Sequence, residues 1–421
     1  MSPSGFRRSP LLVLFLTVFI DLMGFGIVIP LLPAYAERLH HATPFMAGSL
    51  VGIYSFMQLV FAPFWGALSD RIGRRSIILM SIAGSAVSYL LLGVAWSIDI
   101  LFLARILAGV AGANIPVAQA YVADVTPPNE RARGMGLIGA AFGLGMVIGP
   151  ALGAGLTLVS PRAPEFFAAG LCVVNFGLAA ASLPESLPEG RRRHRRFRHP
   201  LSPESLRVAA APPGAPVLFA IFFLVTLGFS VLYGTFPLAA ERLSESWAAT
   251  RGGSEPACSH SCIYGLLAYM GVVAVAVQGW FLGWLARRVS EATLIRVGAL
   301  GLALGLAWIP FTGGPAALLL AVGLVATGQG LAGPPLSSLV SQTAAGESYG
   351  EVLGVSQSLS AAARALGPTG GGLIFERLGA PAAYVCAALC ALGALGFALS
   401  LARHMAEDRA SSASLGLRRS G

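Results

Sequence analysis

Long runs of apolar residues, separated by short polar joints, fill most of this chain. A helix that crosses a membrane needs about 20 apolar residues, and a backbone in lipid must satisfy its own hydrogen bonds. The runs are far longer than the strands of a membrane barrel, so we expect helices. Twelve spans are predicted, at 11–36, 46–68, 76–96, 98–121, 134–157, 165–183, 216–238, 263–284, 293–311, 315–340, 350–374 and 380–402.

Composition supports a membrane protein. Of the 421 residues, 55% are hydrophobic and 11% are charged, whereas soluble domains carry about 25% charged residues. The net charge of +9 comes from arginine, because the chain contains no lysine. These arginines lie between apolar runs and not on a soluble, aromatic-rich surface, so we predict no nucleic-acid partner.

The positions of the arginines predict orientation. They concentrate in both termini and in the joints after the second, fourth, sixth and eighth spans. Positively charged joints stay in the cytoplasm, which places both termini there, in a multi-pass protein of the plasma (inner) membrane. Residues 1–10 are too short and polar for a cleaved signal, so the first span is expected to be retained.

A basic linker divides the predicted spans into two sets of six. We expect an N-terminal six-helix half at 1–183, a cytoplasmic linker at 184–214, a C-terminal half at 215–402 and a cytoplasmic tail at 403–421. The arginine run 191–198 is expected to attract anionic lipid. A regulatory partner is the alternative.

The two halves resemble copies of each other. The pattern at 66–71 recurs at 283–288, and the pattern at 149–153 recurs at 367–371, with nearly the same spacing. Repeated halves are typical of transporters, whose substrate path lies between them near the membrane midplane.

The joint between the second and third spans combines glycines with charged residues. Gly66 allows close helix packing, and Asp70 is suited to a helix N-terminus or an arginine. Topology anchoring and simple packing are the alternatives. The joint comprises Gly66, Asp70, Arg71, Gly73, Arg74 and Arg75.

Three ionisable residues stand out inside the predicted spans: Asp21, Arg105 and Arg364. Because charges in lipid are costly, such residues are functional candidates. Asp21 can exchange a proton, although a buried ion pair or a capping contact is the alternative. Either arginine could pair with Asp21, and Arg364 could instead pack between the halves.

Polar amides and aromatic rings also lie within spans. The amides either bond between helices or line a polar cavity together with Arg364. They are Asn114, Gln119, Gln278, Gln329 and Gln357. Aromatic residues that could form an apolar wall are Tyr54, Phe56, Tyr233 and Phe236.

Enzyme chemistry is not indicated. All six histidines lie outside the spans, and without lysine there is no Walker-type nucleotide motif. We therefore expect no cofactor and no catalytic residues, and we expect the energy for transport to come from an ion gradient or from a partner protein. Cys258 and Cys262 lie in a predicted outer loop and allow either a disulfide or free thiols, while a metal site lacks ligands.

Several motifs together resemble one family. Span 11–402 resembles a twelve-helix major facilitator superfamily transporter, and its first half is most similar to the drug:proton antiporter group that includes tetracycline-efflux proteins. The matching stretches are Asp21 with Gly26, Pro30 and Pro33; Gly66 to Arg75; Arg105 with Gly109; Gly145, Gly149, Pro150 and Gly153; Tyr121 to Asp124; Glu130 to Arg133; and Leu183 to Ser186.

This resemblance implies roles for the motifs. It implies that 66–75 is a gating loop and that Asp21 and Arg105 take part in proton coupling. It also implies that 145–153 is an antiporter motif, in which a Gly-Pro kink shapes the helix where it packs against the other half. The expected function is proton-coupled efflux of a small hydrophobic or drug-like molecule by a monomer. An importer or facilitator of a metabolite such as a sugar or organic ion is the alternative, and a non-transporting receptor or scaffold is a third interpretation.

The chain also departs from the tetracycline-efflux pattern. Ser88 and the stretch 301–305 stand where those proteins carry aspartates, and Arg287 replaces the acid in the second copy of the joint. We therefore do not expect a metal-chelated tetracycline as substrate, and we expect a less charged molecule in an uncharged cavity.

Overall fold

The structure is almost entirely helical. It is a computed structural model that describes residues 10–418 except 29–31, 113–114, 127–136, 139–140, 142–143, 146–147, 151, 154, 188–199, 213, 251–257, 259 and 344–348. The helices are α1 (Pro10–Val28), α2 (Leu32–His40), α3 (Pro44–Ile72), α4 (Arg74–Val94), α5 (Ile98–Ala111), α6 (Ile115–Val125), α8 (Ala163–Ser182), α9 (Pro203–Ala210), α10 (Ala215–Thr250), α11 (His260–Ala276), the π-helical turn η2 (Val277–Phe281), α12 (Leu282–Leu285), α13 (Glu291–Trp308), the 3₁₀ turn η3 (Ile309–Phe311), α14 (Pro315–Thr343) and α15 (Tyr349–Arg418).

The helices agree with the predicted spans. Within the described residues, ten helices are long and apolar enough to cross a membrane. The last of these contains two predicted spans, because α15 bends at Gly379, whose φ is +87°. The predicted span 134–157 is described only in short helical pieces. The predicted all-α membrane fold is therefore confirmed.

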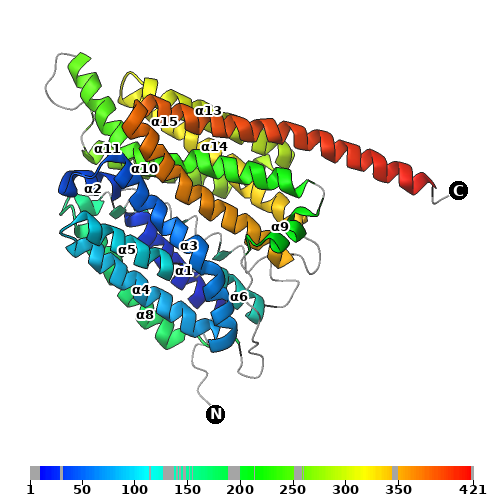
Figure 1. Cartoon of the computed structure of the whole chain (residues 1–421), viewed down its shortest axis with the longest axis horizontal. Coiled ribbons are helices and arrows are strands. Elements are labelled where there is room, and N and C mark those ends of the chain that lie inside the picture. Colours follow the sequence, from blue (N-terminus) through cyan, green and yellow to red (C-terminus); the bar gives the residue numbers. More distant parts are fainter. Residues whose placement is uncertain are drawn as a thin grey trace, which may run out of the picture.

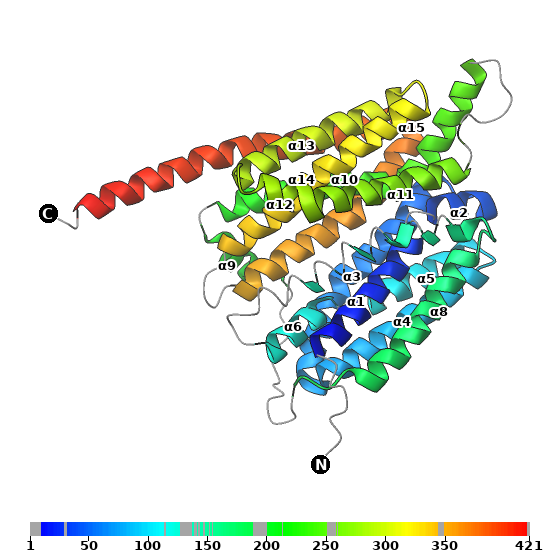
Figure 2. The ribbon, with the colours of Figure 1, turned by 180° about the vertical axis from the view of Figure 1, so that it is seen from behind.

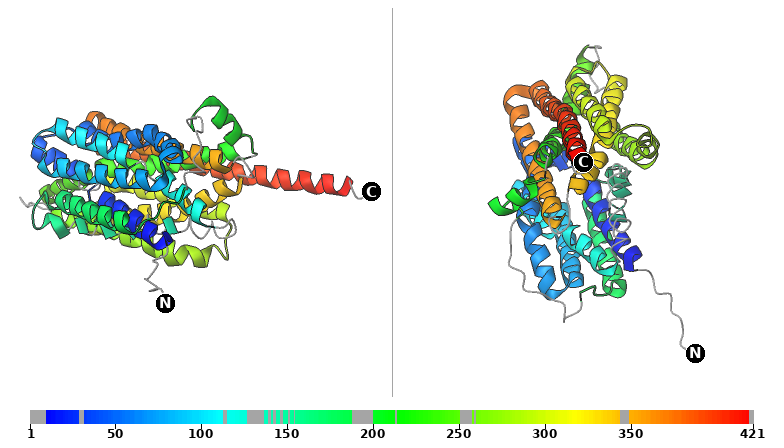
Figure 3. Two further views of the ribbon diagram at one scale, coloured as in Figure 1. Left: turned by 90° about the horizontal axis from the view of Figure 1, so that it is seen from below. Right: turned by 90° about the vertical axis from the view of Figure 1, so that its right-hand side faces the viewer.

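The chain forms two helical bundles that lie side by side (Figures 1 and 2). Helices α1 to α8 enclose one apolar core, which includes Leu14 and Ile82. Helices α9 to α15 enclose a second, which includes Phe236 and Leu302. Figure 3 shows the same division from two further directions, with the end of α15 extending past the bundles. The boundaries at 183, 214 and 402 stay predictions.

Large apolar side chains also cover the outside of both bundles. Val173, Leu320 and Leu389 are each about 60% exposed. Soluble monomers rarely expose wide continuous apolar surfaces, so this surface fits contact with lipid.

The sequence sets where several helices begin. The hydroxyl of Thr43 accepts the backbone N–H of Met46 at the start of α3, and Pro44 occupies the first turn. Ser97 and Ser290 cap α5 and α13 in the same way. Such residues satisfy N–H groups that have no partner within the helix.

The two halves make equivalent internal contacts, as a duplication predicts. A Cβ at Gly149 would lie 2.7 Å from the Cα of Gly26 in α1. A Cβ at Gly367 would lie 2.9 Å from the carbonyl oxygen of Leu227 in α10. The first helix of each half thus packs directly against the repeated Gly-Pro segment of the same half.

A disulfide joins Cys258 to Cys262, which settles the question that the sequence left open. The Ser244 hydroxyl near the end of α10 accepts the N–H of Cys258 at 2.6 Å and donates to its carbonyl oxygen at 3.0 Å. Trp247 donates to the carbonyl oxygen of Thr312 at 2.7 Å. These bonds attach the long end of α10 to two loops on one side of the molecule. We call that side the outer side and the opposite one the inner side.

Candidate functional site

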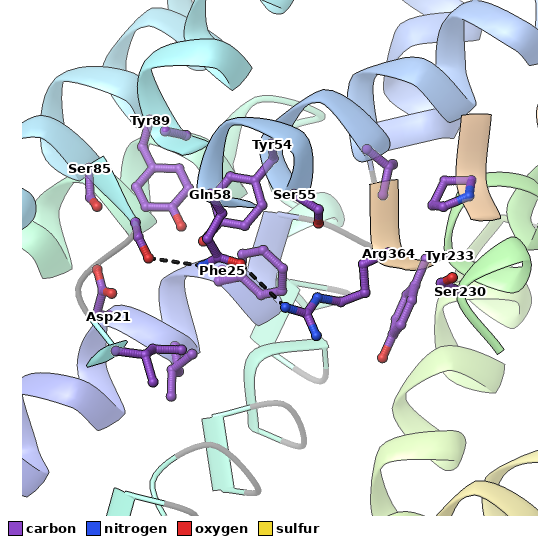
Figure 4. Close-up of a pocket in the computed structure, with 16 residues that line it drawn as sticks. Asp21, Phe25, Tyr54, Ser55, Gln58, Ser85, Tyr89, Ser230, Tyr233 and Arg364 are labelled. Carbon is purple, nitrogen blue, oxygen red and sulfur yellow. Dashed lines mark hydrogen bonds between the residues drawn. The ribbon is translucent and has the colours of Figure 1, made fainter. Parts of the chain in front are cut away.

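A cavity lies between the two halves (Figure 4). Its volume is about 90 Å³, and one buried water needs about 10–15 Å³ by such a measure. The cavity therefore has room for several waters or a small ligand. Its lining residues are Asp21, Leu22, Phe25, Val51, Tyr54, Ser55, Gln58, Ser85, Tyr89, Ala108, Gly112, Ile115, Ser230, Tyr233, Arg364 and Pro368.

Asp21 comes from the middle of α1 and borders this cavity (Figure 4). Its surroundings are small or aromatic. Gly24, one turn further along, leaves space for the ring of Tyr89, whose Cε2 would lie 3.4 Å from a Cβ at that position. The glycine therefore allows an aromatic wall beside the carboxyl group.

Arg105 does not line the cavity but lies behind Tyr54. The guanidinium is 4.6 Å from the centre of the Tyr54 ring, and its Nε donates to the carbonyl oxygen of Leu50 at 3.1 Å. The side chain is 1% exposed, and its Nη2 makes no hydrogen bond to any described residue. Tyr54 thus contacts Arg105 and shares the cavity with Asp21.

Arg364 is the positively charged residue of the cavity, and it comes from the second half. Its Nη1 donates to Ser360, and its Nη2 donates to Oε1 of Gln58 at 3.4 Å, across the gap between the halves (Figure 4). Gln58 in turn donates to the carbonyl oxygen of Gly112 at 3.0 Å. In the described part of the chain, no carboxylate lies within ion-pair distance of Arg364. The expectation of an uncharged cavity is therefore wrong, because Asp21 and Arg364 both line it.

The other predicted cavity residues do not gather here. Gln119 and Gln329 are half-buried elsewhere, Gln278 and Gln357 are exposed, and Asn114 lies outside the described residues. Tyr54 and Tyr233 line the cavity as expected, while Phe236 is buried in the second core and Phe56 is exposed. The sequence analysis missed Gln58, Ser85 and Tyr89, which also line the cavity. Their side chains are uncharged, and polar uncharged residues in a span can equally serve in helix packing.

The charged joint at 66–75 forms a compact cluster on the inner side. Arg74 pairs with Asp70 at 2.6 Å and with Asp124, at the end of α6, at 3.2 Å. Ser186 donates to the same Asp124 carboxylate at 3.1 Å. Arg71 is exposed. The predicted contact between Asp70 and an arginine is thus present, within the first half.

Glu185 completes this cluster; from the sequence it was noted only within the stretch 183–186 that resembles the tetracycline-efflux pattern, without a role of its own. Its two carboxylate oxygens accept the backbone N–H groups of Arg74 at 2.9 Å and Arg75 at 3.2 Å, which begin α4. Arg75 also donates to the carbonyl oxygen of Ala180 at 2.6 Å. A carboxylate at a helix N-terminus is favourable, so α8 and α4 are tied together at their inner ends.

Close packing at Gly66 is absent in this conformation. No atom of a described residue outside its own helix would lie within 4 Å of a Cβ there.

The predicted antiporter motif packs against α1 close to Asp21. A Cβ at Gly145 would lie 2.9 Å from the backbone nitrogen of Met23, and Gly149 approaches Gly26 as described above. Pro150 and Gly153 are buried. The described contacts of Gly145 and Gly149 lie within the first half, whereas the resemblance led us to expect contact with the other half.

Comparisons with known proteins agree on the family. Residues 14–368 match the Major Facilitator Superfamily. The chain is 32% identical over 366 residues to the class C tetracycline resistance protein of Escherichia coli, covering 86% of this chain and 88% of that protein. It is 27% identical over 374 residues to multidrug resistance protein 2 of Bacillus subtilis, covering 88% and 90%.

A solved structure is similar over nearly the whole length. The crystal structure of the human organic anion transporter MFSD10 (TETRAN) shares 26% identity and a TM-score of 0.68, covering 94% of this chain and all of that one. With the helical fold, the match over 14–368 and the relative at 32% identity, the chain belongs to the Major Facilitator Superfamily of membrane transporters.

Proposed function

We propose that this transporter exports a small drug-like molecule in exchange for protons. The observation that carries the proposal is the position of Asp21 in the cavity between the two halves. An ionisable group within an apolar membrane-spanning helix is a functional candidate. The relatives named as tetracycline and multidrug resistance proteins support export as the direction.

Exchange follows from competition at Asp21. A cationic or neutral polar cargo is held better when the carboxyl group is ionised, and protonation removes that attraction. If the halves rock about the cavity, each passage carries either the cargo or the proton. Tyr54 transmits the charge state of Asp21 to Arg105, because its ring contacts the guanidinium.

Tetracycline chelated to a metal ion is not the proposed cargo. Ser88 donates to the carbonyl oxygen of Gly84 at 2.7 Å and is fully buried away from the cavity. A Cβ at Gly305 would lie 2.7 Å from a methyl group of Val325, so an acid there has no room.

The test is transport driven by a pH gradient in everted membrane vesicles, with a cargo found by a toxicity screen in an efflux-deficient host. We expect Asp21→Asn to lower proton-driven uptake at least about tenfold while counterflow without a gradient continues, because the cavity remains but the proton site is lost. Asp99→Asn is the matched control, since that acid is exposed at the start of α5. Unchanged proton-driven uptake in Asp21→Asn would contradict the proposal.

Arg364 favours a second candidate function, the transport of an organic acid together with a proton. With Asp21 protonated, Arg364 leaves the cavity with a positive charge that attracts an anion. Two unit charges about 8 Å apart at an effective dielectric constant of about 20 interact by about 2 kcal/mol, a factor of about thirty in affinity. Here proton and cargo bind together and move in the same direction. The similar human structure is that of an organic anion transporter.

The two candidates predict opposite responses to one substitution. Arg364→Gln should lower the affinity for an acidic cargo at least about tenfold, and should leave a cationic cargo bound equally or more tightly. Binding measured at low and high pH separates them further, because an acid binds better at low pH and a cation at high pH. If Arg364→Gln leaves the binding of an acid unchanged, the organic-acid function is excluded.

Further features belong to the same proposal. We place both termini in the cytoplasm of an inner-membrane protein that works as a monomer, with halves at 1–183 and 215–402. The arginine run 191–198 lies outside the described residues, and its attraction to anionic lipid stays a prediction from its charge. A receptor or scaffold is disfavoured, because charged residues in apolar spans lower the stability of a membrane protein. A transporter can use such charges, whereas a scaffold gains little from them.

A further inference from the structure

The two halves meet along α3 and the first part of α15, which lie side by side (Figures 1 and 2). Three glycines allow this contact. A Cβ at Gly52 would lie 2.5 Å from the carbonyl oxygen of Ala365, and one at Gly48 would lie 2.9 Å from the carbonyl carbon of Pro368. The backbones of α3 and α15 therefore approach closely at two points, which lie one helical turn apart along α3.

The third glycine lies on the opposite helix and nearer the outer side. A Cβ at Gly372 of α15 would lie 3.1 Å from the carbonyl carbon of Pro44, the first residue of α3. The antiparallel contact thus extends to the N-terminus of α3, at the outer side of the molecule.

A carboxylate from the other half sits at this N-terminus. Oε2 of Glu376 accepts the backbone N–H of Phe45 at 3.0 Å, and its carboxylate also bonds the side chain of Thr43. Phe45 is in the first turn of α3, where backbone N–H groups have no partner within the helix. Glu376, a residue of the second half, therefore caps α3 of the first half. Its negative charge is favourable at a helix N-terminus.

We propose that Glu376 is a positioning residue that holds the outer side closed by capping α3. The inference rests on the alternating movement proposed above. When the outer side opens, α3 leaves α15 and Phe45 loses this acceptor, so the cap stabilises only the closed state. Glu376 thus sets the fraction of molecules whose outer side is closed, although it contacts neither the cargo nor the transported proton.

The experiment measures the distance between spin labels on the outer side of the full-length protein in lipid nanodiscs, without cargo. The labels replace Trp96 and Phe311, which are 75% and 66% exposed in outer loops of the two halves. Cys172, Cys386 and Cys390 are replaced by alanine, and the disulfide remains. We expect Glu376→Ala to raise the ratio of open to closed molecules roughly 2- to 30-fold, as loss of a cap does.

Two further variants decide the interpretation. Arg377→Ala removes a neighbouring exposed charge and should leave the distances unchanged, while Gly372→Ala should open the outer side because a methyl group there meets Pro44. Unchanged distances in Glu376→Ala, or equal shifts in Glu376→Ala and Arg377→Ala, would overturn the proposal. Since no cargo is used, this result is independent of whether Asp21 couples transport to protons.

Discussion

Gly73 joins α3 to α4 in a conformation that favours glycine. Its φ is +104°, and a Cβ there would lie 2.8 Å from the Cδ of Glu185. The carboxylate can cap α4 only because this residue has no side chain. The predicted gating loop therefore needs Gly73 for its shape.

Replacing this residue should be costly. We expect Gly73→Ala to destabilise the protein by about 1–3 kcal/mol, because it adds backbone strain and displaces the Glu185 carboxylate. The apparent melting temperature in detergent measures the loss. Gly66→Ala is the control within the same joint, since a Cβ there meets no described neighbour outside its own helix. Equal melting temperatures for the two variants would contradict the argument.

The sequence could identify single charged residues better than their partners. Asp21 and Arg364 stood out because charges in apolar spans are rare, and both line the cavity. Glu185 and Asp124 were noted only within stretches that resemble the tetracycline-efflux pattern and were given no role, since acids next to a membrane are common and their contacts depend on which helix ends lie nearby. Gln58 was missed because an amide gains its role only from the residue opposite it, here Arg364.

At the scale of helices, the glycine-rich segment around 145–153 fixes the position of α1. Gly145 and Gly149 allow its backbone to approach the stretch of α1 that follows Asp21. A larger residue would move α1 and with it the carboxyl group in the cavity.

A single methyl group tests this packing. Gly149→Ala places a Cβ 2.7 Å from Gly26, and we expect about 1–3 kcal/mol of destabilisation, typical of overpacking, with transport at least about tenfold lower. Gly155→Ala, two residues beyond this segment and with no described atom within 4 Å of its Cβ, should behave like the unchanged protein. Transport that survives in Gly149→Ala would show that the close approach is not required.

At the scale of the whole molecule, apolar patterning predicts the helices and the repeat predicts which of them correspond. The repeated Gly-Pro segments pack against α1 in one half and α10 in the other, as a duplication requires. The sequence did not indicate where the halves touch. That contact depends on α3 and α15, which are far apart along the chain and belong to different repeats.

The disulfide between Cys258 and Cys262 has a consequence for the direction in which the molecule sits in its membrane. Disulfides persist in oxidising compartments and are rare where thiols are kept reduced. We propose that the loop that carries this bond, and the end of α10 attached to it, face away from the cytoplasm. Redox chemistry supports this proposal independently of the arginines, whose charges predict the same orientation.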